Sequence, residues 1–89
     1  MIYLDNSATT KPCAACVETM QHLLLRAWGN PSSVHQLGMD AERCLRTARG
    51  QVAKALGAEE GRVFFTSGGT EADNWAIFGT AERLAKRGR

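Results

Sequence analysis

One feature constrains the possible fold of this chain more than any other: a short apolar run that is followed at once by a glycine turn and a helix start. The run from Arg62 to Thr66 has consecutive apolar residues, which is typical of a strand buried on both faces of a parallel α/β sheet. Such a strand needs neighbours on both edges, yet only Ile2 to Leu4 forms another β-prone run. We therefore predict part of a larger α/β protein, or a chain that completes its fold with another polypeptide.

The turn after this run, from Ser67 to Glu71, predicts a binding site for an anion. Backbone N–H groups at a helix N-terminus lack internal partners and carry a partial positive charge, so they bind phosphate well. Gly68 and Gly69 would let the backbone turn tightly and approach a ligand, while Ser67 and Thr70 could add hydroxyl donors. A plain strand-to-helix connection with a Ser or Thr cap has the same pattern, and this alternative stays open. The glycine patterns of nucleoside triphosphate and dinucleotide sites are absent.

Composition excludes several classes of function. The 89 residues are 44% hydrophobic and 22% charged with a net charge of +2, as in soluble globular proteins. This charge is too small to indicate nucleic-acid binding. No apolar stretch approaches the roughly 18 residues that span a bilayer, and no signal peptide is recognised. We expect no membrane partner and a cytoplasmic location.

Three cysteines, an odd number, argue against a disulfide framework. Cys13 and Cys16 form a Cys-x-x-Cys pair, which could be a redox pair or half of a zinc site. Cys44, His22 and His35 do not repeat that spacing, so we predict no metal site. The alternative is two small apolar side chains on an early helical turn.

Apolar periodicity predicts three helices. The first begins with Pro12 at a first helical position and stops at the break over residues 28–33. The second runs from about Val34 to Leu56, and the third begins near Thr70. Each of these boundaries carries the usual error of a few residues.

Two signals set the ends of the second helix. Ser33 and Gln36 fit a capping box at its start. Gly57 stands where a helix end favours a left-handed residue. One apolar stripe along this helix is made of Leu37, Ala41, Cys44, Ala48, Val52 and Leu56.

Three blocks in order carry a resemblance to a known family: residues 2–10 (IYLDNSATT), 29–35 (GNPSSVH) and 65–74 (FTSGGTEADN). Together they resemble the N-terminal part of cysteine desulfurases, the NifS/IscS-like members of the class V aminotransferase superfamily. The resemblance implies an α/β protein of fold type I, with pyridoxal phosphate as cofactor. It implies that residues 1–15 are an N-terminal arm belonging to the small domain. Residues 16–89 would begin the large cofactor-binding domain, which is incomplete here.

The resemblance also implies an activity and partners. Such enzymes remove sulfur from L-cysteine, giving L-alanine and an enzyme-bound persulfide that is passed to sulfur-acceptor proteins for iron–sulfur cluster assembly. They are homodimers. Gly69 and Thr70 match the positions that hold the cofactor phosphate. Further matches lie near the active-site entrance or the dimer interface: Asn6, Ala8, Thr9, Asn30 and His35. For these five, ordinary turn or helix-cap roles remain the alternative.

The residues that perform the family's chemistry are not recognised in this chain. The Schiff-base lysine follows a Ser-x-His motif far downstream in the family, and the persulfide cysteine lies on a later loop. Ser33-Val34-His35 imitates that motif, but Gln36 follows in place of a lysine. We therefore assign no catalytic residue and expect the isolated chain to be inactive.

Two alternatives remain from the sequence. Another class V enzyme, such as a selenocysteine lyase, would share these blocks, because substrate choice lies in downstream loops. A non-catalytic remnant or interaction module could instead pair with a complementary or full-length class V subunit, since its apolar helix faces would otherwise be exposed.

Overall fold

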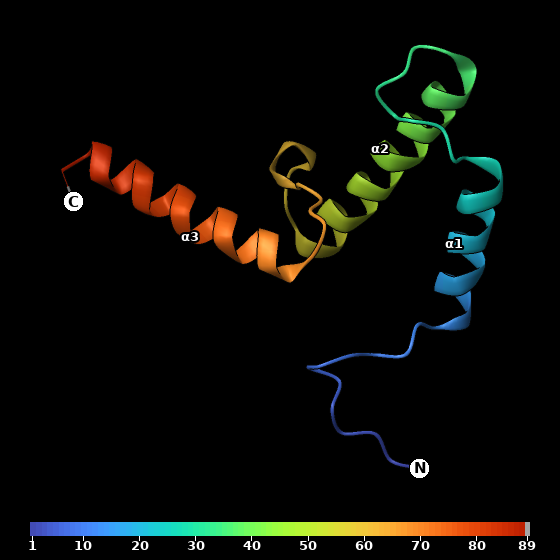
Figure 1. Cartoon of the computed structure of the whole chain (residues 1–89), viewed down its shortest axis with the longest axis horizontal. Helices are drawn as coiled ribbons and strands as arrows, with labels where there is room; N and C mark the ends of the chain where they lie inside the picture. The colour runs from blue at the N-terminus through green and yellow to red at the C-terminus, as the bar shows by residue number, and fades with distance from the viewer. Residues whose placement is uncertain (89) are drawn as a thin grey trace. The chain divides into compact units, whose positions relative to one another are not determined.

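The computed structural model describes residues 1–88 and contains three α-helices and one short 3₁₀ helix in that range. In chain order these are α1 (Ala14–Arg26), α2 (Gln36–Leu56), η1 (Glu60–Arg62) and α3 (Gly69–Lys86), as Figure 1 shows. The chain divides into two compact units, one from Met1 to Gln51 and one from Val52 onward. No helix in the described range is long and apolar enough to cross a membrane.

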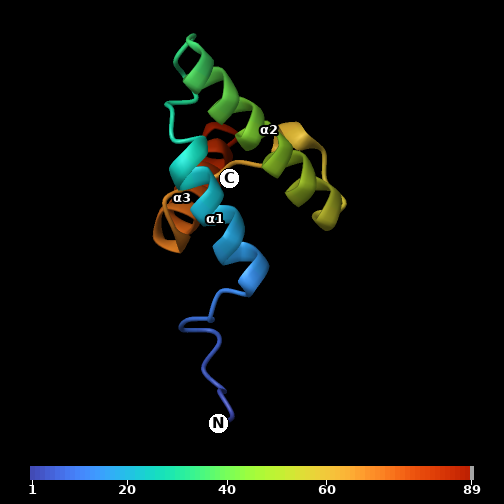
Figure 2. The same cartoon turned by 90° about the vertical axis from the view of Figure 1, so that its right-hand side faces the viewer.

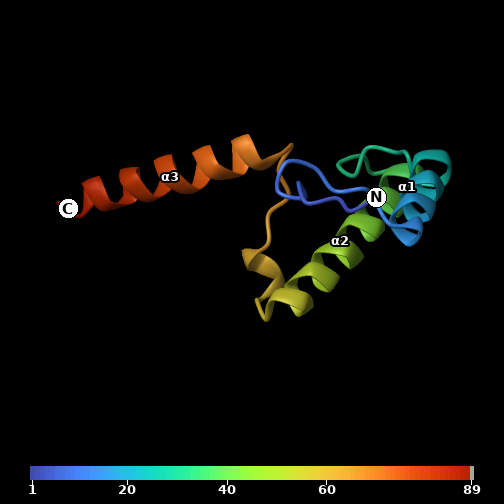
Figure 3. The ribbon, with the colours of Figure 1, turned by 90° about the horizontal axis from the view of Figure 1, so that it is seen from below.

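Both predicted strands are wrong for this structure. Residues 2–4 and 63–66 are irregular, residue 62 ends η1, and no strand occurs within residues 1–88. Figures 2 and 3 draw the segment before α1 and the segment between η1 and α3 as plain tubes. The local conformation is nevertheless extended at Val63, with φ −105° and ψ 121°. A strand exists only as part of a hydrogen-bonded ladder, so an extended backbone alone does not make one.

The C-terminal end of α2 follows the prediction. The helix ends at Leu56, and Gly57 is left-handed with φ +66°. The N–H of Ala58 donates to the Ala53 carbonyl at 2.8 Å, and the N–H of Gly57 donates to the Lys54 carbonyl at 3.3 Å. These two bonds form a Schellman motif, which satisfies helix-end carbonyls that would otherwise lack partners.

The N-terminal ends of the first two helices differ from the predictions. Cys13 is the N-cap of α1, so Pro12 precedes the helix and does not open it. The capping box at α2 is wrong, because the Gln36 amide donates to Asp40 at 2.7 Å. Instead the Nδ1 atom of His35 accepts the N–H of Gly38 at 3.3 Å. A ring nitrogen therefore caps this helix in place of the predicted Ser33 hydroxyl.

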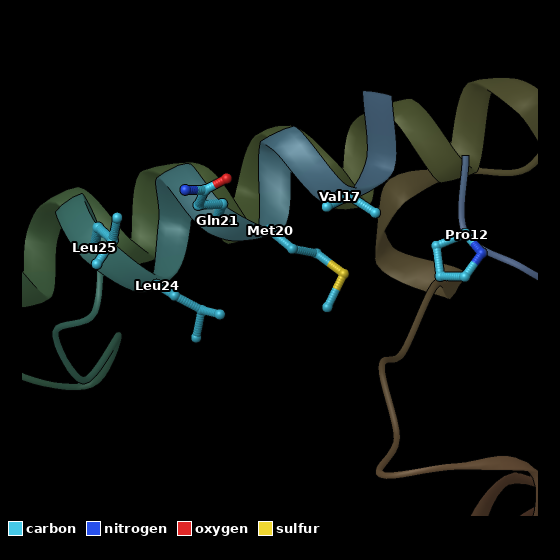
Figure 4. Close-up of a pocket in the computed structure, with 6 residues that line it drawn as sticks. All are labelled: Pro12, Val17, Met20, Gln21, Leu24 and Leu25. Atoms are coloured by element: carbon cyan, nitrogen blue, oxygen red, sulfur yellow. The ribbon is translucent and has the colours of Figure 1, made fainter. Parts of the chain in front are cut away.

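Little apolar surface is covered within the described residues. The buried apolar side chains are Ala41 and Ala53, which lie on α2 at 6% and 2% exposure. The predicted stripe on α2 is helical but only partly covered, since Leu37 is 38% and Leu56 is 73% exposed. An open apolar groove of about 570 Å³ runs along α1, and it is lined by Pro12, Val17, Met20, Gln21, Leu24 and Leu25. Figure 4 shows these six side chains.

The connection between α1 and α2 packs tightly against the start of α2. A Cβ atom at Gly29 would come within 2.9 Å of the Leu37 Cβ. A Cβ atom at Gly38 would meet the Asn30 carbonyl oxygen at 2.6 Å and the Ser33 Cβ at 2.7 Å. Real Cβ atoms essentially never approach so closely, so both positions need glycine to keep this bend.

We expect Gly38→Ala to destabilise the fold by about 1–3 kcal/mol through overpacking, although alanine favours helices. Gly79→Ala is the matched control, because it also places alanine in a helix but its Cβ meets only the Trp75 ring, at 3.7 Å. Gly79→Ala should stabilise α3 by roughly 1 kcal/mol. Urea unfolding followed by circular dichroism measures both changes, and equal stabilisation by the two variants would contradict the packing at Gly38.

Candidate functional site: the start of helix α3

The predicted anion site lies at the N-terminal end of α3. Gly68 is the N-cap, and its carbonyl accepts the N–H of Ala72 at 3.1 Å. The preceding N–H groups, those of Gly69, Thr70 and Glu71, have no acceptor among residues 1–88. Such groups, together with the helix dipole, favour an anion.

A threonine that the sequence reasoning did not single out holds the glycine turn in place. The Thr66 hydroxyl donates to the Gly68 carbonyl at 3.0 Å. On the helix side, the Asn74 amide donates to the Thr70 carbonyl at 2.8 Å. Threonine two residues before a turn glycine often makes such a local bond. The Thr-Ser-Gly pattern could therefore have predicted this hydrogen bond.

Glu71 occupies part of the donor set. Its carboxylate accepts both the hydroxyl and the backbone N–H of Ser67. The Ser67 hydroxyl, and then the Ser67 N–H, hold the pKa of the Glu71 carboxyl below its ordinary value of 4.5. Glu71 therefore stabilises the helix start through its two hydrogen bonds with Ser67.

The two turn glycines matter because they lack side chains and leave open space, and not because they adopt unusual dihedral angles. Gly68 has φ 171°, which is extended backbone, so the predicted need for a special turn conformation is wrong there. A Cβ atom built at Gly68 or at Gly69 would meet nothing within 4 Å. What glycine provides here is an open approach to the backbone N–H groups.

An aromatic pair fastens the segment before the turn to α3. The rings of Phe64 and Trp75 lie 5.5 Å apart at an interplanar angle of 54°, a tilted arrangement that aromatic pairs favour. Both residues remain more than half exposed, Phe64 at 65% and Trp75 at 54%. The pair also lines a shallow pocket of about 280 Å³ that Thr66 borders.

The predicted residues of the N-terminal arm lie in one turn. The N–H groups of Ala8 and Thr9 both donate to the Asp5 carbonyl, at 3.1 and 3.3 Å. The Thr10 hydroxyl donates to the Asn6 carbonyl at 3.0 Å. Asn6, Ala8 and Thr9 are therefore neighbours on an exposed turn.

Asn30 and His35 lie in the bend before α2. The Asn30 side-chain oxygen accepts the Ser32 N–H, and the Asn30 carbonyl accepts the Ser33 N–H, both at 2.9 Å. His35 caps α2 through Nδ1. Both side chains thus hold backbone N–H groups of this bend or of the first turn of α2.

Removing the Ser67 hydroxyl tests the electrostatics of the helix start. In Ser67→Ala, the midpoint of Glu71 titration should rise toward 4.5, because the largest cause of its lowered pKa is lost while the backbone N–H bond remains. A carboxyl whose pKa is lower in the folded than in the unfolded state stabilises the fold at pH values above its unfolded-state pKa. This stabilisation is lost as the pH falls through its folded-state pKa. Acid fraying of α3 should therefore begin at higher pH in the variant. Carboxyl chemical shifts in NMR report the midpoint. Ser33→Ala is the control, and an unmoved Glu71 midpoint would contradict the bond.

Curated proteins similar to this chain are considerably longer than it. A NifS/IscS protein homolog from Lactobacillus delbrueckii is 52% identical over 91% of this chain and 21% of its own length. The cysteine desulfurase IscS of Methanosarcina thermophila is 46% identical over 99% of this chain and 22% of its own length. The selenocysteine lyase of Xenopus tropicalis is 47% identical over 93% of this chain and 19% of its own length. The chain thus spans about a fifth of the length of these relatives.

No solved structure matches this chain significantly. The family described as aminotransferase class-V matches residues 2–89, which is nearly the whole chain. The similarity to NifS/IscS proteins falls in their N-terminal region, in agreement with the resemblance of the three sequence blocks. The chain belongs to the class-V aminotransferase family and corresponds to the N-terminal region of NifS/IscS-like cysteine desulfurases.

Proposed function

We propose that this chain supplies the phosphate-binding turn of a pyridoxal-phosphate-dependent cysteine desulfurase. Residues 1–15 would be its N-terminal arm, and residues 16–89 would begin its large domain. The observation that carries the proposal is the set of donors left at the start of α3 once Glu71 has engaged Ser67.

The remaining donors suit the phosphate of the cofactor. The N–H groups of Gly69 and Thr70 have no acceptor within the described chain, and the Thr70 hydroxyl likewise makes no hydrogen bond there. The space beside Gly68 and Gly69 is open to an approaching group. A phosphate with two negative charges would gain from the helix dipole and from charge-assisted hydrogen bonds. These are the two residues, Gly69 and Thr70, that the family resemblance implies.

The Glu71 carboxylate limits where an anion can bind at this helix start. Its carboxylate lies on the Ser67 side of the turn, where it accepts two hydrogen bonds. A second anion is repelled from that side, so the phosphate is directed toward the donors of Gly69 and Thr70. The Gly68 carbonyl oxygen accepts hydrogen bonds from the Thr66 hydroxyl and from the N–H of Ala72, which hold this part of the turn in place.

In our proposal, the reaction also requires an amine and a thiol that this chain does not supply. When bound, pyridoxal phosphate serves as an electron sink for bond cleavage next to the amino carbon of the substrate. The amine that would hold the cofactor and the thiol that would accept sulfur come from the remaining part of the protein. The 89 residues would bind and orient the phosphate, and alone they would not turn over L-cysteine.

The other implied roles follow from the same assignment. The exposed turn with Asn6, Ala8 and Thr9 would lie at the active-site entrance, and the bend with Asn30 and His35 would approach the site of the partner subunit in a homodimer. L-Cysteine would be the substrate, and sulfur-acceptor proteins would receive the product sulfur.

A second candidate is selenocysteine lysis. It is favoured by the similarity to selenocysteine lyases of two Xenopus species, at 47% and 45% identity. Identities to relatives named cysteine desulfurase reach 52%. We place desulfuration first for this reason, and a comparison of turnover on the two amino acids by the completed enzyme distinguishes them.

A chimera tests the proposed role directly. In it, this chain replaces the matching N-terminal region of the Methanosarcina thermophila desulfurase, to which it is 46% identical over 99% of its length. We expect a dimer that contains pyridoxal phosphate and releases alanine from L-cysteine. Thr70→Val should weaken cofactor binding about 10- to 100-fold, because a hydrogen bond to a charged group contributes about 1.5–3 kcal/mol. The absorbance of bound cofactor measures its occupancy.

Two further variants separate binding from folding. Gly69→Ala should lower cofactor occupancy without reducing helix content, since its Cβ meets nothing within 4 Å in the chain itself. Thr80→Val, on the same helix but away from its start, is the control and should retain the cofactor. A folded, dimeric chimera that lacks cofactor would refute the proposed function, as would equal cofactor affinity in Thr70→Val and Thr80→Val.

A further inference from the structure

Two cysteines lie at the start of α1, and neither the fold nor the proposed function makes use of them. Cys13 is the N-cap of the helix, and Cys16 is the third residue inside it. Both are free thiols and both are exposed, so small molecules can reach them. The Cys-x-x-Cys spacing of the sequence thus coincides with the first turn of a helix.

The backbone of this turn sets the two residues at a separation that suits a disulfide. The Cys13 carbonyl accepts the N–H of Val17 at 3.1 Å, so the Cys13 Cα already lies on the path of the helix. Two Cα atoms three positions apart on an α-helix are separated by about 4.5 Å along the axis and by about 5 Å in space. Disulfides join residues whose Cα atoms are roughly 4.4–6.8 Å apart. The bond therefore needs rotation of side chains but no movement of the backbone.

The N-cap and the third helical residue also have side chains that face each other. In a capping box, the N-cap side chain reaches the third helical residue, and the side chain of that residue reaches back to the N-cap. Here both of these positions hold cysteine. The Cys13 thiol makes no capping hydrogen bond, and the Cys16 thiol makes a weak contact with the Met20 sulfur at 3.9 Å. Both exposed thiols can turn toward each other without the loss of a strong interaction.

The chemistry open to this pair is that of two thiols. Within residues 1–88, no group of three or more His, Cys, Asp or Glu side chains is placed to hold a metal ion, so the pair lacks the further ligands of a zinc site. We propose that Cys13 and Cys16 form a reversible disulfide by exchange with a small disulfide such as glutathione disulfide. Exposed disulfides are more easily reduced than buried structural ones, which is why this bond is reversible.

The exchange takes two steps. One cysteine thiolate attacks a sulfur of glutathione disulfide, which forms a mixed disulfide and releases one glutathione thiolate. The second cysteine thiolate then attacks the cysteine sulfur of the mixed disulfide and releases the other glutathione thiolate. The two protons of the cysteine thiols pass through solvent to the two glutathione thiolates. The cysteine pair thus loses two electrons, and glutathione disulfide gains them.

The new bond would join the N-cap of α1 to the third residue of the helix. In the reduced chain no side chain caps this end of α1. Oxidation would therefore fix the junction between α1 and the segment that precedes it. This inference does not rest on the proposed cofactor site, which lies at the start of another helix.

Redox equilibration of the whole chain tests the proposal. The chain is incubated anaerobically with mixtures of reduced and oxidised glutathione, the remaining thiols are alkylated, and peptide mass spectrometry identifies the products. We expect a Cys13–Cys16 disulfide that reduced glutathione reverses. In Cys13→Ser and Cys16→Ser, the remaining cysteine of the pair should carry glutathione or the alkyl group. Cys44→Ser removes the free thiol on α2 and should leave the pair oxidised at the same glutathione ratio.

A variant of unchanged composition makes the test specific to the geometry of α1. Ala15→Cys combined with Cys16→Ala moves the second thiol by one position. The natural pair is separated by about 60° of helix arc, whereas the moved pair is separated by about 160° and lies on opposite sides of the helix. We expect the moved pair to need an about tenfold more oxidising glutathione mixture. This difference should become smaller in concentrated urea, and circular dichroism checks that α1 is retained without it.

Three results would overturn the proposal. The first is a chain in which Cys13 and Cys16 carry glutathione or the alkyl group at every ratio, with no disulfide between them. The second is equal oxidation of the natural and the moved pair in the folded chain, which would mean that the helix does not promote the bond. The third is a disulfide that joins Cys44 to either member of the pair.

Discussion

Local backbone hydrogen bonds are the main interactions that stabilise this structure, because the described chain buries very little apolar surface. Only Ala41 and Ala53 are buried apolar side chains within residues 1–88. Helices that are not supported by packing are marginal, so their ends matter more than usual. The Schellman motif at Gly57, the His35 cap of α2 and the Glu71 bonds at α3 each satisfy backbone groups at a helix end. The exposed apolar faces are consistent with a chain that spans about a fifth of its relatives' length.

The start of α3 shows how one helix end can serve two purposes. A helix N-terminus offers several N–H groups, and one carboxylate cannot accept all of them. Glu71 takes the donors of Ser67, which stabilises the start of the helix. The donors at Gly69 and Thr70 remain for a ligand, and the missing Cβ atoms leave room for it. The structural role of Glu71 and the proposed phosphate role of its neighbours are therefore compatible.

The candidate site could be located from sequence because its determinants are local. Glycine after an extended run, a hydroxyl residue and an early glutamate all act within a few residues of one another, so their spacing was enough to place the helix start. The conformation of Gly68 could not be inferred, because glycine permits a turn without requiring it. The bond from the Thr66 hydroxyl to the Gly68 carbonyl was missed because the predicted strand included Thr66, although a threonine close to a turn can make such a local bond.

The sequence by itself determined the three helices, the end of α2 at Gly57 and the family, because periodicity, end signals and ordered motifs are properties of neighbouring residues. Only the tertiary structure decided that His35 and not Ser33 caps α2, and that Gly38 must lack a side chain against the Asn30 carbonyl. It also decided that neither β-prone run is a strand within residues 1–88. Caps and ladders depend on where a partner atom lies in space, and a sequence pattern specifies the donor without placing the acceptor.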